Sequence, residues 1–100
     1  MAPRSRRFSP QTLAALAVLA EAGAGWRYGL ELAAATGLKS GSLYPILIRL
    51  AERGLLESCW QEPDRPGRPP RHAYRLTAAG RSALNEAMQP APALLKEAFQ

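Results

Sequence analysis

The sequence predicts a mainly helical domain with one small β-hairpin. Three observations support this prediction. Apolar residues recur at helical spacing in the first half of the chain, two short segments with strand-like alternation follow, and prolines separate those two segments. A chain of 100 residues, 47% of them hydrophobic, is long enough for one domain with its own core. We expect a basic arm over residues 1–8, the folded domain over residues 9–88 and a C-terminal segment over residues 89–100.

The first helix is expected over about residues 10–22. Ser9 is a good N-cap residue, and Pro10 suits the first helical position. Phe8 before the cap and Leu13 after it occupy the positions of a hydrophobic staple. Glycines follow the helix and should end it. The stripe predicted to face the core consists of Leu13, Leu16, Ala17 and Ala20.

Two shorter helices should follow, separated by a tight turn. The second helix covers residues 28–36 and ends at Gly37, which suits a left-handed cap. We expect Ser40 to cap the third helix, which runs to Gly54. Pro45 lies near the start of that helix, so it costs at most one hydrogen bond. Two short helices joined in this way are a helix-turn-helix candidate. The core face of the third helix should carry Leu43, Ile46, Leu47 and Leu50.

The second half of the chain changes to strand-like alternation. Residues 55–62 and 71–77 alternate as strands do, and residues 63–71 between them contain four prolines and one glycine. This loop should follow a stiff, polyproline-like path that places Arg65, Arg68 and Arg71 on similar sides. Thr77 should cap a fourth helix over residues 78–88. The order of elements is that of a winged helix-turn-helix, with a two-stranded wing and a C-terminal helix interrupted by prolines.

Charge and position together indicate double-stranded DNA as a partner. The net charge is +5, and arginines cluster in the N-terminal arm and in the wing. The second helix of a helix-turn-helix enters the major groove, and its free N–H groups favour phosphate. A protein partner, with the basic residues serving only solubility, is the alternative. The candidate DNA contacts are Lys39, Ser40, Gly41, Ser42, Tyr44, Pro45, Arg49, Arg65, Arg68 and Arg71.

Several of these residues have a second, purely structural interpretation. Ser40 either caps the helix or contacts a phosphate, and both roles are compatible. Arg49 either contacts a base or a phosphate, or pairs with Glu52 on the surface. Tyr44 either reaches a phosphate with its hydroxyl or packs half-buried. The wing loop either contacts phosphate or the minor groove, or is merely solvated.

The sequence offers little for catalysis or for a cofactor. It contains one cysteine and one histidine, no cluster of metal ligands and no glycine-rich phosphate loop beside a strand, so we expect no enzyme and no cofactor. Cys59 is expected as a buried or half-buried thiol, and His72 as a packed or hydrogen-bonded side chain. Trp26 and Trp60 either line a ligand pocket or pack in the core, and we expect them in the core. No apolar run is long enough for a membrane span, and the start of the chain does not resemble a secretory signal, so a cytoplasmic, nucleoid-associated protein is expected.

Three motifs together resemble the PadR family of bacterial transcriptional regulators. They are YG-x-E-L at residues 28–32, the LYP-containing helix of residues 40–50 followed by E-x-G-L, and a G-R-P wing that leads to Y-R-L-T and A-G-R. The resemblance covers about residues 13–84. It implies a homodimeric repressor that binds a palindromic operator and is released by a small-molecule effector.

The resemblance also implies dimerisation through the C-terminal helix with help from the first helix. Here Pro90 and Pro92 interrupt that C-terminal helix, which departs from the family pattern. The candidate dimer contacts are Leu13, Leu16, Leu84, Met88, Leu94, Leu95 and Phe99.

Overall fold

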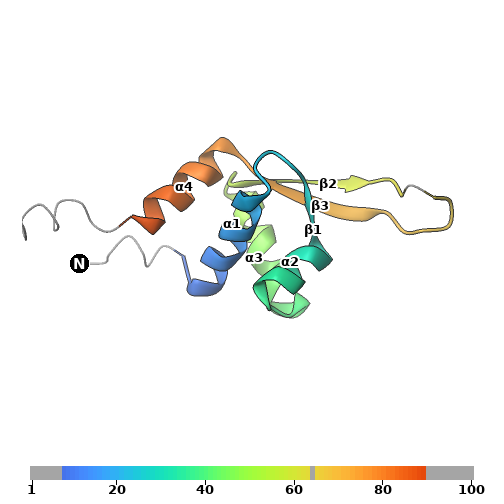
Figure 1. The fold of residues 1–100 in the computed structure, drawn as a ribbon, viewed down its shortest axis with the longest axis horizontal. Helices are drawn as coiled ribbons and strands as arrows, with labels where there is room; N and C mark the ends of the chain where they lie inside the picture. The colour runs from blue at the N-terminus through green and yellow to red at the C-terminus, as the bar shows by residue number, and fades with distance from the viewer. Residues whose placement is uncertain (1–7, 64, 90–100) are drawn as a thin grey trace, which may run out of the picture.

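The computed structural model describes residues 8–63 and 65–89. In this part of the chain the elements are α1 (Pro10–Glu21), β1 (Arg27–Tyr28), α2 (Gly29–Thr36), α3 (Ser40–Glu52), β2 (Leu56–Gln61), β3 (Arg71–Leu76) and α4 (Ala78–Met88). The β2–β3 hairpin extends away from the helices at one end of the molecule, and α4 lies at the other end (Figure 1). The predicted winged helix-turn-helix is confirmed.

Helix α1 begins where the sequence predicts, and most of its predicted stripe contacts the core. The Ser9 hydroxyl accepts a hydrogen bond from the backbone N–H of Thr12 (3.1 Å), so the N-cap is confirmed. Of the predicted stripe, Leu16 is buried in the core and Leu13 and Ala20 are partly buried against it, so the prediction is confirmed at these three positions, and Ala17 is partly buried. Because α1 packs against α2, β3 and α4 at once, no single leucine-rich stripe determines its burial. Its buried residues are Thr12, Ala15, Leu16 and Leu19.

The turn between α2 and α3 is one residue shorter than predicted. Gly37 has a φ of +75° and is the left-handed cap of α2, as expected. Ser40 is already the first residue of α3, and Lys39 is its N-cap without a side-chain hydrogen bond, so the prediction that Ser40 caps α3 is wrong. The Thr36 hydroxyl accepts from the Leu38 N–H (3.2 Å), which closes the turn early. The predicted core face of α3 is confirmed: Leu43, Ile46, Leu47 and Leu50 are all buried.

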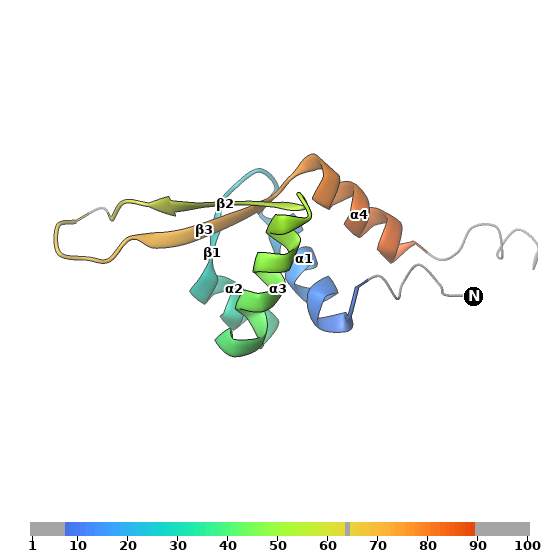
Figure 2. The same cartoon turned by 180° about the vertical axis from the view of Figure 1, so that it is seen from behind.

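The sheet has three antiparallel strands in the order β1-β3-β2, one more strand than predicted. Strand β1 pairs Arg27 with Tyr74 and Tyr28 with Ala73, so it joins the start of α2 to the wing. The hairpin itself runs in register from Leu56 opposite Leu76 to Gln61 opposite Arg71. Figure 2 shows β1 beside β3, between the wing and α2.

The tip of the wing is a tight turn rather than an extended path. Gly67 has a φ of +90°, and the Arg68 N–H donates to the Arg65 carbonyl (3.4 Å). A glycine with positive φ after a proline is the pattern of a type II turn, and it reverses the chain. The predicted polyproline-like path across the loop is therefore wrong.

The base of the wing and the start of α4 are held tightly together. The Thr77 hydroxyl accepts from the Gly80 N–H (3.0 Å), which confirms the predicted cap of α4, and it donates to the Gly54 carbonyl (2.7 Å). A Cβ placed on Gly80 would overlap the carbonyl of Leu55, so only glycine allows this close approach. The core below this contact includes Phe8, Leu16, Leu19, Leu32, Leu47, Leu56, Tyr74 and Leu84.

Candidate nucleic-acid interface

The start of α3 presents small residues and free backbone donors to solvent. Lys39, Ser40, Gly41 and Ser42 are all exposed. A Cβ placed on Gly41 would have no atom within 4 Å, so none of the described residues covers this position. Ser42 N–H is the first amide of the helix to find a backbone acceptor, in the Lys39 carbonyl (2.9 Å). The amides before it are available to an anion such as a phosphate.

Tyr44 favours the packing interpretation over the phosphate contact. Its side chain is partly buried against the core. A Cβ on Gly29 would overlap the Tyr44 hydroxyl, so the ring fills the space that this glycine leaves open. Tyr44 therefore fixes α3 against the start of α2.

Pro45 is exposed within α3, and the helix continues through it. Because proline has no N–H, the carbonyl of Gly41 lacks its usual partner four residues on. This leaves an acceptor as well as donors at the exposed end of α3.

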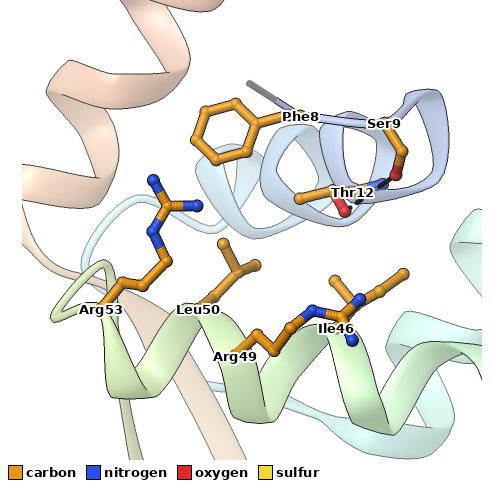
Figure 3. A pocket seen from close by; sticks show the side chains of 7 residues that line it. All are labelled: Phe8, Ser9, Thr12, Ile46, Arg49, Leu50 and Arg53. Atoms are coloured by element: carbon orange, nitrogen blue, oxygen red, sulfur yellow. Dashed lines mark hydrogen bonds between the residues drawn. The ribbon is translucent and has the colours of Figure 1, made fainter. Parts of the chain in front are cut away.

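Arg49 and Arg53 lie on the side of α3 that faces the start of α1 (Figure 3). They border a pocket of about 220 Å³ between the two helices. Within the described residues Arg49 makes no ion pair, so the alternative pairing with Glu52 does not form. The guanidinium of Arg53 lies 5.4 Å from the centre of the Phe8 ring. Sequence reasoning missed Arg53, although its position one turn after Arg49 was a signal. The pocket is completed by Phe8, Ser9, Thr12, Ile46 and Leu50.

The three wing arginines are not equivalent. Arg65 and Arg68 are exposed at the turn. The guanidinium of Arg71 instead lies 3.5 Å from the centre of the Tyr28 ring, and the Tyr28 hydroxyl donates to Gln61 (2.7 Å). Arg71 and Tyr28 therefore join the wing to β1, whereas Arg65 and Arg68 are available to a ligand.

An aromatic stack lies on the exposed face of the wing. Trp60 is 66% exposed, so its expected place in the core is wrong. Its ring stacks on His72, with centroids 4.4 Å apart and an interplanar angle of 13°. His72 Nδ1 lies 3.1 Å from the Tyr74 hydroxyl, which confirms the hydrogen-bonded role of this histidine. Burial raises the pKa of Tyr74, and the nearby Tyr44 adds to this rise.

Two other side chains of the sheet, Arg75 and Cys59, do not add to the exposed positive charge. Arg75 donates to Glu57 across the hairpin (2.5 Å), and its guanidinium lies 4.4 Å from the centre of the partly buried Trp26 ring. Cys59 is a half-buried free thiol, one of the two states expected. Within the described part of the chain, the cations of the site that make no ion pair are therefore found on α3 and at the tip of the wing.

The candidate dimer contacts fall into three groups. Leu16 is fully buried and Leu84 is 6% exposed, so both belong to the core of the single chain, and Leu13 is partly buried. Met88 is 64% exposed at the end of α4. Leu94, Leu95 and Phe99 lie outside the described residues.

Residues 8–63 and 65–89 contain neither a membrane-spanning helix nor a cluster of metal ligands. None of the helices there has the length and apolar character needed to cross a membrane. In the same residues, no three metal-binding side chains lie close enough to hold an ion.

Comparison with known proteins gives a family and a set of related folds. Residues 16–86 match the model of the transcriptional regulator PadR-like family. A PadR-like transcription factor from Bacteroides fragilis is 26% identical, with a TM-score of 0.62 over 89% of this chain and 85% of that one. A PadR family regulator from Clostridium difficile R20291 is 24% identical, with a TM-score of 0.66 over 77% and 81% of the two chains.

A third solved structure includes nucleic acid. The transcriptional repressor CouR, bound to a 23-mer DNA duplex, is 28% identical, with a TM-score of 0.63 over 80% of this chain and 52% of that one. The chain spans only 52%, 60% and 61% of three larger similar structures, the first of which is the regulator PcaV from Streptomyces coelicolor. No curated protein matches the sequence.

Proposed function

The chain belongs to the PadR-like family of transcriptional regulators, and from this premise we propose that it binds double-stranded DNA through α3 and the tip of the wing. The observation that carries the proposal is an exposed start of α3 together with arginines on α3 and at the wing that make no ion pair with any described residue. The family is one of transcriptional regulators rather than enzymes.

In this proposal α3 enters the major groove and the wing follows the flanking backbone. The free amides at Ser40 and Gly41, with Ser42 and Lys39 beside them, contact phosphate at the entry to the groove. Pro45 loosens this first turn, which lets the backbone adjust to the DNA. Arg49 and Arg53 bind phosphates on the side of α1, and Arg65 and Arg68 bind phosphates or the minor groove. Tyr44 and Arg71 support these contacts by holding α3 and the wing in place.

We further propose a homodimer that represses transcription at a palindromic operator. A two-fold dimer presents two copies of α3 to two half-sites, which explains why such operators are palindromic. Exposed Met88 at the end of α4 and the segment after it are the proposed dimer contacts, and partly buried Leu13 on α1 is a further one. An effector that releases the operator, and a place in the bacterial cytoplasm at the nucleoid, complete the proposal.

Selection of bound duplexes from a random DNA pool, with the full chain, tests DNA binding without a known operator. Affinity for the selected duplex should fall steeply with salt, because each neutralised phosphate contributes about −0.9 to the slope of log K against log salt concentration. Arg68→Ala should weaken binding to all sequences alike and make this slope shallower by about one unit.

Arg81→Ala is the matched control, because Arg81 is an exposed arginine on α4, outside the proposed interface. It should change neither affinity nor slope by a comparable amount. A flat salt response, or equal losses for both variants, would count against the proposed surface. A pool in which no sequence is enriched would favour the protein-partner alternative.

A further inference from the structure

Ile48 is a large apolar side chain left in solvent on α3. It is 56% exposed, whereas the adjacent Leu47 is fully buried. A β-branched residue is not a strong helix former, so helix propensity does not explain its place on an exposed face. The fold of the single chain therefore makes little use of this side chain.

The position of Ile48 places it where α3 would meet base edges. At 100° per residue, Ile48 shares the outermost face of α3 with Gly41, Pro45 and Glu52. Arg49 instead lies on the flank towards α1, in the pocket with Thr12 and Arg53 (Figure 3). Arg49, the residue type best suited to a bidentate contact with guanine, is therefore directed to the edge of α3, where a phosphate would lie.

The major groove contains one apolar group among its base edges, the 5-methyl group of thymine. Positive charge beside the outer face, from Arg49 and Arg53, and at the exposed wing tip suits a polyanion and not an apolar partner. Gly41 and Pro45 add no long polar side chain that would hold the helix away from the groove. The part of this face formed by Gly41, Pro45 and Ile48 is therefore apolar and complementary to a thymine in the major groove, and Glu52 lies one turn further along the helix.

Resting on the proposed function, we propose that Ile48 is a specificity-determining residue that contacts a thymine methyl group in each half-site. Arg49 then acts as a backbone contact that positions α3. Burial of one methyl group is worth about 0.8 kcal/mol, which corresponds to a roughly fourfold change in affinity per thymine. Two half-sites in a dimer complex should give a change of about tenfold or more.

Deoxyuridine substitution tests this contact directly, because it removes only the methyl group. Duplexes from the selected pool are prepared with each thymine replaced in turn by deoxyuridine, in both half-sites together. For the wild-type chain, one position should lower affinity by about tenfold. For Ile48→Ala that position should show no loss, because the methyl group no longer has a partner, while Ile48→Val should retain part of it.

Leu30→Ala is the control, because Leu30 is 82% exposed but lies on α2. It should keep the full deoxyuridine effect. The inference is overturned if a specific duplex is bound but no thymine is sensitive to the substitution, if Ile48→Ala keeps the same sensitivity, or if the selected site has no thymine. A pool with no enriched sequence overturns the proposed function itself, and the inference with it.

Discussion

Replacing Gly80 with alanine should destabilise the protein, although alanine is the better helix former. The new Cβ would overlap the Leu55 carbonyl oxygen and would lie 3.2 Å from Leu76 Cδ2. The carbonyl cannot easily move away, because it accepts the Thr77 N–H (3.1 Å) at the junction of β3 and α4. Overpacking of this kind costs up to roughly 3 kcal/mol, and the gain in helix propensity offsets about 1 kcal/mol of it. We expect a net loss of about 2 kcal/mol in the free energy of unfolding.

Urea denaturation measures this loss, at a fixed protein concentration because the stability of the proposed dimer would depend on concentration. Gly41→Ala is the matched control, because its Cβ would meet no atom within 4 Å. Its free energy of unfolding should stay unchanged or rise by up to about 1 kcal/mol. If Gly80→Ala were as stable as the wild type, or if both variants lost equal stability, the close contact between α4 and Leu55 would not be the cause.

Three further predictions concern Tyr74 and Tyr28 in the sheet and Arg53 at the end of α3. The raised pKa of Tyr74 means that the folded state holds the phenol proton more tightly than the unfolded state. The free energy of unfolding should therefore keep this contribution below about pH 10 and lose it as the pH rises through the folded-state pKa. Tyr74→Phe should reduce this loss at alkaline pH, measured by urea titrations. Tyr28→Phe removes the 2.7 Å hydrogen bond to Gln61 and should lower the free energy of unfolding by about 0.5–1.5 kcal/mol, measured by the same titration; no change would mean that water replaces the bond. Arg53→Ala should weaken DNA binding at all sequences alike in a binding titration, whereas a loss confined to one base position would assign Arg53 to base contact instead.

The local signals of the sequence predicted most of the helices. The caps at Ser9 and Thr77 are confirmed because each depends only on a side chain and an amide three residues later. The apolar spacing of α3 is likewise confirmed, because one face of this helix is covered and the other is not. The family motifs led to the family that the comparison gives.

The errors arose where burial depends on distant parts of the chain. Strand β1 is only two residues long, and its partner in β3 cannot be seen from its own sequence. Alternation in β2 correctly indicated a strand, but nothing in it showed that no layer covers Trp60. Ile48 was not among the candidate contacts, and only the structure shows how much of it meets solvent. The candidate DNA contacts themselves stay predictions.

Strand β1 also has a consequence for the order in which the protein folds. The hairpin joins residues that are near in sequence, whereas the pairing of Arg27 with Tyr74 encloses α2, α3 and the whole wing in one loop. Closing so long a loop costs entropy that two residue pairs repay only when the helices are already packed. We therefore expect the amides of β1 to be protected late during refolding and to exchange with deuterium earlier than those at the base of the hairpin.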